Sequence, residues 1–211
     1  TVVNDLIPEI GTTATIDEEK EVCATEVFTL TDTVEYKHLV PGKGYTVKGI
    51  LMDKATGEPF LQNGEQITSE VTFVPEAPSG SVEVLFTFDA KLIKADTNIV
   101  VFESLYTDSK ELTVHADIED EAQTVTVIVP EIKTEASTDG KKETTIGGEI
   151  TIEDIVSYHN LTPGKEYVVK GTLMNKTTGK PVTVNDEPVT AEAAFTPETR
   201  DGEVKVAFTF N

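Results

Sequence analysis

The chain repeats itself, and this internal repeat constrains its fold more than any other feature of the sequence. Residues 32–59 align without gaps with residues 154–181, at an offset of 122 positions, and 17 of the 28 aligned residues are identical. The same offset places residues 86–88 on residues 208–210. A repeat of this length is too long for a solenoid unit and suits an independent domain. The sequence therefore predicts a tandem array of domains.

A chain of 211 residues can hold one or two domains, and the repeat favours two. We place them at residues 1–128 and residues 129–211. The second copy ends at Asn211, the counterpart of Asp89. By this alignment it lacks the C-terminal strands of the first copy.

Apolar and polar residues alternate with a period of two inside each copy, which is typical of half-buried β-strands. The alternation is clear over residues 28–36 and over residues 82–88. Turn sequences rich in Pro, Gly and Asn separate such stretches. No long amphipathic helix is evident. The pattern predicts an all-β protein built of β-sandwich domains.

Charge and composition exclude several classes of function. The chain has 38 acidic against 17 basic residues, a formal charge of −21, so neither nucleic acid nor anionic lipid is an expected partner, because phosphate recognition needs a positive surface. No apolar run approaches the ~20 residues that span a bilayer, and residues 1–20 lack the pattern of a signal peptide. We expect no membrane insertion in this segment. The single cysteine, Cys23, excludes an internal disulfide and a cysteine metal cluster.

Polar residues occur at four positions where the alternation requires apolar ones in the first copy. They are Thr12, Asp32, Glu103 and Gln123. If their strands meet, a hydroxyl, an amide and two carboxylates converge in an apolar core, as a satisfied polar network or as a reaction site. Each residue taken alone has an ordinary structural explanation. His115 lies off the apolar parity of its segment, so periodicity assigns it no role.

A local motif makes this combination more specific. The pattern H-x-D-x-x-D-x-x-Q-T runs from His115 to Thr124, and it accompanies residues 8–14, residues 32–36 and the Val-Phe-Glu run within residues 100–103. In order and spacing these segments resemble the Thr-Gln ester-bond domains, or VaFE-type repeats, of Gram-positive surface adhesins. The resemblance implies tandem immunoglobulin-like sandwiches of the collagen-adhesin B type, in which a threonine of the first strand is esterified to a glutamine of the last.

The resemblance implies a catalytic set at Thr12, Gln123, His115, Glu103 and Asp32. Thr13 is a less suitable nucleophile because its parity points outward, and the role of Asp120 stays open. A threonine hydroxyl needs a base such as the imidazole of His115. Buried carboxyls at Asp32 and Glu103 could share a proton and act as its donor. Such a domain reacts once and is not an enzyme with turnover, and no cofactor or metal is predicted.

The same resemblance implies a location outside the cell, at the cell wall surface, and a structural role in the stalk of an adhesin. Its expected partners are neighbouring repeats of the same chain and, through other domains, an unknown host receptor. The second copy offers Thr134 and Asp154, whereas its counterparts of Glu103, His115 and Gln123 would fall beyond residue 211. We therefore expect no reaction within residues 129–211.

Three alternatives remain at the level of sequence. An isopeptide domain requires an inward lysine on an early strand, and the candidates all lie in polar segments: Lys20, Lys37, Lys43 and Lys48. An inert or ligand-binding spacer would bury the polar cluster without reacting. A calcium site at the acidic run of residues 117–121 lacks the glycine and ligand spacing of an EF-hand.

Overall fold

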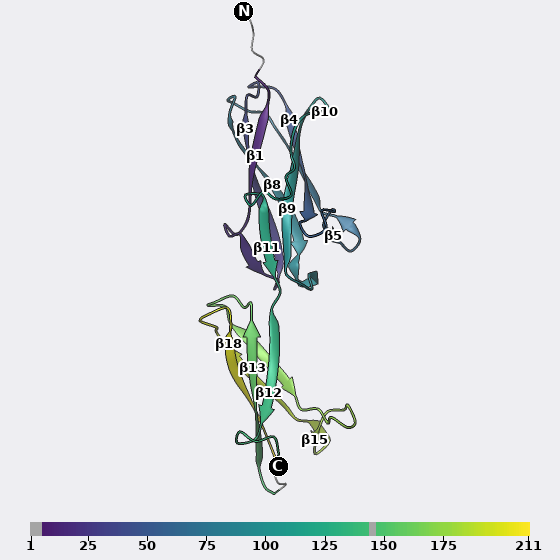
Figure 1. The fold of residues 1–211 in the computed structure, drawn as a ribbon, viewed down its shortest axis with the longest axis vertical. Coiled ribbons are helices and arrows are strands. Elements are labelled where there is room, and N and C mark those ends of the chain that lie inside the picture. The colour runs from purple at the N-terminus through teal and green to yellow at the C-terminus, as the bar shows by residue number, and fades with distance from the viewer. Residues whose placement is uncertain (1–5, 144–146) are drawn as a thin grey trace, which may run out of the picture. The chain divides into compact units, whose positions relative to one another are not determined.

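The computed structural model describes residues 6–143 and 147–211. The chain divides into two compact units, Thr1–Val129 and Pro130–Asn211, each shown as a ribbon in Figure 1. Strands dominate both units. Within the described residues the helical structure is a single 3₁₀ turn, η1 (Ala90–Leu92). No helix in the described part of the chain is long and apolar enough to cross a membrane. The prediction of an all-β protein is confirmed.

The first unit is a sandwich of two sheets. One sheet has the strand order β1-β3-β8, and the other has the order β2-β11-β9-β4-β7, with β10 also paired to β9. A small β5-β6 hairpin extends from the sandwich. The strands are β1 (Glu9–Ile16), β2 (Glu21–Cys23), β3 (Val27–Lys37), β4 (Tyr45–Asp53), β5 (Leu61–Gln62), β6 (Glu65–Gln66), β7 (Thr68–Phe73), β8 (Gly80–Asp89), β9 (Thr97–Thr107), β10 (Lys110–His115) and β11 (Thr124–Ile128).

The alternation of apolar and polar residues allows the two sheets to pack face to face. In β3 every second residue from Phe28 to Tyr36 is buried, and the opposite sheet contributes Val47, Leu51 and Leu105 to the same core. Branched and aromatic side chains suit this arrangement because they pack well on a pleated surface. The predicted β-sandwich is confirmed.

The first and last strands of the unit meet, although they are far apart in the sequence. The backbone N–H of Ala14 in β1 donates to the carbonyl of Ala122, 2.9 Å away, just before β11 begins. Strand β11 then runs parallel to β2 and antiparallel to β9. The sandwich therefore brings Thr12 and Gln123 to neighbouring segments.

The second unit repeats the register of the first. Its sheets have the orders β12-β13-β18, β14-β17 and β15-β16. Thr134 lies opposite Val156 just as Thr12 lies opposite Val34. The strands are β12 (Glu131–Ser137), β13 (Ile150–His159), β14 (Tyr167–Thr172), β15 (Thr183–Val184), β16 (Glu187–Pro188), β17 (Thr190–Phe195) and β18 (Gly202–Phe210).

A glycine in β4 sets how closely the sheets approach. A Cβ added at Gly49 would lie 2.5 Å from the ring of Phe86, whose side chain is fully buried. We predict that Gly49→Ala lowers the free energy of unfolding by about 1–3 kcal/mol, because the ring has no free space to enter. Gly11→Ala is the control, since its Cβ meets nothing within 4 Å. Calorimetric unfolding in which both variants match the parent would contradict the prediction.

Candidate functional site

The four polar residues that the alternation assigns to the core are buried between the two sheets. Asp32 and Gln123 have no exposed surface, Glu103 is 1% exposed and Thr12 is 6% exposed. They come from β3, from the residue before β11, from β9 and from β1 respectively. Thr13, the neighbour of Thr12, is exposed on the outer face. Buried polar groups of this kind require partners or a chemical purpose.

A hydrogen bond joins the amide of Gln123 to Glu103. The Nε2 atom of Gln123 donates to Oε2 of Glu103 over 2.8 Å, and it lies 3.5 Å from the backbone carbonyl of His115. The carboxyl group of Glu103 is therefore in direct contact with the nitrogen atom that a reaction at the amide carbon would release.

Two carboxyl groups in this cluster have raised pKa values. Burial, and next the interaction with Asp32, raise the pKa of Glu103 to about 10. Burial also raises the pKa of Asp32, against the opposing effects of hydrogen bonds with Glu103 and Thr12 and of electrostatic interactions with His115 and Lys20. Two carboxyls this close cannot both ionise cheaply. The raised pKa of Glu103 therefore keeps a proton on this pair at neutral pH.

Several atoms of the cluster lie close to one another without an aligned hydrogen bond. They are Thr12 Oγ1, both carboxyl oxygens of Asp32, Glu103 Oε1, Gln123 Oε1 and His115 Nδ1, all buried. The hydroxyl of Thr12 still influences the pKa values of both carboxyls. The carboxyls and the hydroxyl therefore interact with one another, while the contact between Gln123 and Glu103 has well-aligned hydrogen-bond geometry.

His115 enters the cluster because of an irregularity in β10. A bulge between Glu111 and Thr113 shifts the register, so that His115 pairs with Glu103 on β9. Simple alternation from Leu112 misses this reversal, and for that reason the sequence pattern assigned the histidine no role. The Nε2 atom of His115 lies 3.2 Å from Oδ2 of Asp120, which leaves the buried Nδ1 as the ring atom facing the interior.

The structure shows what Asp120 contacts, whereas the sequence motif alone left its role open. Its backbone carbonyl accepts from the backbone N–H of Gln123 at 3.2 Å and from the hydroxyl of Thr124 at 2.7 Å. Its Oδ1 atom accepts from the N–H of Ala122 at 2.8 Å. Asp120 therefore fixes both the imidazole of His115 and the turn that delivers Gln123.

Sequence reasoning missed one charged neighbour of the site. Lys20 was assigned to a polar segment by parity, yet its ammonium group reaches the backbone on both sides of Gln123. Nothing in the local alternation predicts this contact, because it depends on the conformation of a turn and on the reach of a long side chain.

The described residues 6–143 and 147–211 contain no group of three or more His, Cys, Asp or Glu side chains arranged to hold a metal ion. The acidic run before β11 has other contacts. Asp117 accepts from the N–H of Glu119 at 3.0 Å, and Lys54 pairs with Glu119 and Glu121.

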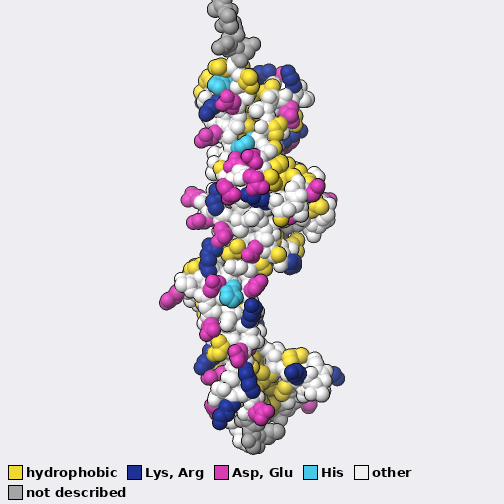
Figure 2. Space-filling view, in the orientation of Figure 1, with side chains coloured by type: hydrophobic (Ala, Val, Ile, Leu, Met, Phe, Trp, Pro, Cys, Tyr) yellow, Lys and Arg dark blue, Asp and Glu magenta, His cyan; other side chains and the backbone are white. Residues whose placement is uncertain are grey.

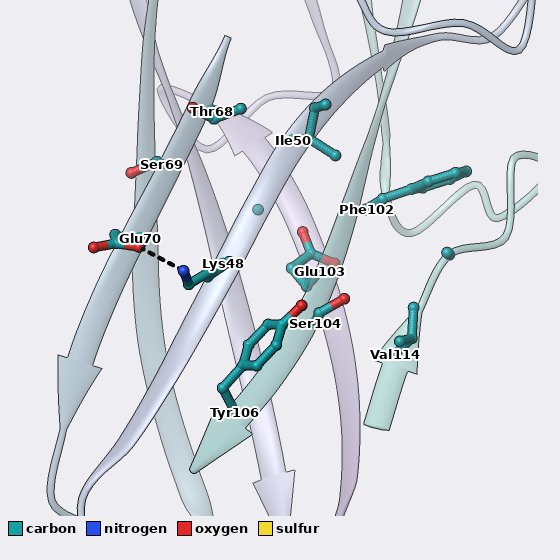
Figure 3. A pocket seen from close by; sticks show the side chains of 12 residues that line it. Lys48, Ile50, Thr68, Ser69, Glu70, Phe102, Glu103, Ser104, Tyr106 and Val114 are labelled. Atoms are coloured by element: carbon teal, nitrogen blue, oxygen red, sulfur yellow. Dashed lines mark ion pairs between the residues drawn. The ribbon is translucent and has the colours of Figure 1, made fainter. Parts of the chain in front are cut away.

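A groove of about 700 Å³ lies on the outward face of the larger sheet (Figure 3). Lys48 crosses it, paired with Glu70 at 3.4 Å and placed 5.5 Å above the centre of the Tyr106 ring. Alternation in β9 turns Phe102 and Tyr106 toward the groove, whereas the carboxyl of Glu103 is buried on the core side. The groove and the buried cluster therefore occupy opposite faces of one sheet.

The sandwich buries a threonine, a glutamine and two acids together and places a histidine beside them. These are the groups that an internal cross-link between side chains would require. The family model of the T-Q ester bond containing domain matches residues 8–127 and residues 130–211. The chain belongs to this family, which confirms the resemblance seen in the sequence.

Solved structures show the same fold at low sequence identity. A bacterial adhesin from Mobiluncus mulieris, described as containing intramolecular disulfide, isopeptide and ester bond cross-links, matches in one crystal form with a TM-score of 0.53 and 16% identity, over 97% of this chain and 100% of that one. A second crystal form of that adhesin matches with a TM-score of 0.51 and 16% identity, over 95% and 93% of the two chains. A search of curated proteins finds no match.

The raised pKa of Glu103 predicts how stability depends on pH. A carboxyl that binds its proton more tightly in the folded state stabilises the fold below the unfolded pKa, and this contribution is lost as the pH rises through the folded pKa. For Glu103 that window runs from about pH 4.5 to about pH 10. In a Thr12→Ala background the free energy of unfolding should fall across this window, by at most about 1.4 kcal/mol per pH unit.

The Glu103→Gln change in the same background removes the titrating group and should flatten this slope. Denaturant unfolding followed by circular dichroism at several pH values measures both slopes. Equal slopes with and without the carboxyl would show that Glu103 is ionised in the fold.

Proposed function

We propose that the first unit forms an intramolecular ester between Thr12 and Gln123, autocatalytically and with loss of ammonia, and that the chain is part of the structural stalk of a surface adhesin. One observation carries the cross-link. The amide nitrogen of Gln123 is hydrogen-bonded to a buried carboxyl with a raised pKa, in the cluster where the Thr12 hydroxyl is also buried. Membership of the ester-bond family supports it.

His115 is the proposed general base. Asp120 holds its Nε2 atom, so the Nδ1 lone pair is available inside the cluster, where it has no other hydrogen-bond partner. It takes the proton of the Thr12 hydroxyl as the oxygen attacks the side-chain carbonyl carbon of Gln123. The role of Asp120 is to orient the ring, as a carboxylate does in other histidine-based nucleophile systems.

Glu103 is the proposed acid for the leaving group. It gives its proton to the Gln123 nitrogen as the carbon–nitrogen bond breaks, and the charge passes to the Glu103 and Asp32 pair. The proton held by His115 then returns to this pair. One hydroxyl and one carboxamide become one ester and one ammonia, so atoms and protons balance. With water excluded, the acyl product persists and each molecule reacts once, which is self-processing and not turnover.

The cross-link predicts a loss of mass. The intact first unit should be lighter than its encoded mass by one ammonia, about 17 Da. Thr12→Ala and Gln123→Ala should abolish the loss, and His115→Ala should slow or abolish it. Thr13→Ala is the matched control, since its side chain is exposed on the same strand, and it should keep the full loss. Intact-mass spectrometry measures all four variants.

Hydroxylamine separates the ester from its rivals, because it cleaves esters and leaves isopeptide bonds intact. Its addition should open the linked protein and leave a hydroxamate at Gln123. An unmutated protein at its encoded mass would instead favour an inert or ligand-binding spacer, with the polar cluster as structure only.

A mechanical role follows from which strands the ester would join. Thr12 lies on the first strand of the unit and Gln123 directly precedes the last. Tension that enters at β1 and leaves after β11 would pass through the covalent bond and bypass the sandwich. A stalk of such repeats resists extension, and a location outside the cell, on the cell wall surface, suits this role. The acidic side chains spread over the face in Figure 2 suit a well-solvated surface.

Single-molecule stretching tests the mechanical proposal. In the unmutated chain the first unit should give no extension event beyond its few residues outside the link. Thr12→Ala should restore one, because about 111 residues then unravel, a gain of roughly 40 nm. By analogy with a disulfide that closes a loop of this size, the link should also add ~4–5 kcal/mol of stability. A full-length event in a chain whose mass shows the ester would refute the proposed force path.

A further inference from the structure

We propose that Lys20 is a positioning residue for ester formation, which fastens the nucleophile's strand to the segment that carries Gln123. The inference rests on the proposed function of the first unit. The ammonium group of Lys20 donates to the backbone carbonyls of Ala14 at 2.6 Å, Ala122 at 2.6 Å and Thr124 at 3.3 Å. One side chain thus bridges β1 and the residues on either side of the glutamine.

The acceptors of Lys20 lie next to the two residues that are proposed to react. Ala14 lies two residues after Thr12 on the same face of β1, and Ala122 is the residue before Gln123. The Ala122 carbonyl also accepts from the N–H of Ala14 at 2.9 Å. The ammonium therefore sits at the crossing of the two segments whose separation sets the distance between hydroxyl and amide.

The backbone holds Lys20 in the position from which it reaches this crossing. Asp17 and Glu18 adopt positive φ angles of 50° and 67°, and they form a tight turn closed by the bridge between Ile16 and Glu19. The carbonyl of Lys20 accepts from the N–H of Thr126 at 2.8 Å, in β11. The lysine is anchored to the last strand by its backbone and to the first strand by its side chain.

The second unit repeats the first part of this arrangement. Lys142 is the counterpart of Lys20, and its ammonium donates to the carbonyl of Ala136, the counterpart of Ala14, at 2.9 Å. The bridge between Thr138 and Lys141 repeats the one between Ile16 and Glu19. A lysine thus holds the first strand in both copies of the repeat.

Lys20 also acts on the charge of the site. Glu103 from β9, His115 from β10 and Lys20 from the β1–β2 turn all face Asp32. The positive charge of Lys20 favours the ionised form of Asp32. Asp120 and Glu121 face the ammonium from the loop before β11. Removal of Lys20 should therefore make Asp32 harder to ionise, and the limb of the rate profile that follows the ionisation of Asp32 should move to higher pH.

The rate of ester formation provides the test. The full chain is made by cell-free synthesis, quenched at intervals in acidic urea, and the fraction lighter by one ammonia is read by intact mass. Lys20→Met should slow the reaction by about 10- to 100-fold, because small misplacements of reacting groups are costly. Lys20→Arg, which keeps the charge and the donors, should recover part of the rate. The pH profile of Lys20→Met should show the shift of the limb that follows Asp32.

Lys54→Met is the matched control. It removes the same charge from a lysine that pairs with Glu119 and Glu121 in the same loop, and it should change the rate by less than about twofold. Each Lys20 variant is also checked for folding in a Thr12→Ala background. If Lys20→Met does not fold, Lys20→Gln replaces it under the same criteria.

The outcomes separate the two proposals. If the unmutated chain never loses ammonia, both proposals are overturned. If the unmutated chain reacts and a folded Lys20→Met reacts at the same rate with an unshifted profile, Lys20 has no positioning role and the ester proposal stands. A slowing no greater than that of Lys54→Met also overturns the inference, because it would reflect charge alone.

Discussion

The contact between the Glu103 carboxyl and the Gln123 amide, sealed between two sheets, is the interaction on which the proposed chemistry depends. In water this carboxyl would be ionised at neutral pH and could donate nothing. Burial raises its pKa to about 10, so the proton is present beside the amide nitrogen. Ammonia that escapes to solvent then makes the step hard to reverse.

The topology of the sandwich explains why such a bond would matter mechanically. Hydrogen bonds between strands are individually weak, and an ordinary sandwich under tension yields at its terminal strands. Here Thr12 and Gln123, the pair proposed to react, lie where β1 crosses the approach to β11, near the two points where tension would enter and leave the unit. Cys23, buried in β2, is the only cysteine of the chain, so no internal disulfide can serve this purpose. An ester built from a threonine and a glutamine needs no oxidant.

The sequence predicted those parts of the site that depend on simple periodicity. Asp32 and Glu103 stood out because each broke a clean alternation, and both are buried as that pattern requires. His115 did not stand out, because a one-residue bulge in β10 reverses which side chains face inward. Lys20 was assigned to a polar segment, because its contact needs two positive φ angles and an acceptor about 100 residues away. Local irregularity and long side chains are invisible to a period-two pattern.

A comparison of the two copies distinguishes the strand register, which local pairing sets, from the burial of the threonine, which needs further strands. In the second unit Thr134, Asp154 and Lys142 occupy the same register as their counterparts, so the pairing of β12 with β13 suffices to place them. Thr134 is nevertheless exposed, whereas Thr12 is buried under the strands that follow β8. Glu103 lies on one of those later strands, which also deliver His115 and Gln123 to the cluster. The proposed reaction therefore requires the complete sandwich: the pairing of β1 with β3 places Thr12 opposite Val34, but the base and the electrophile come from β10 and from the residue before β11.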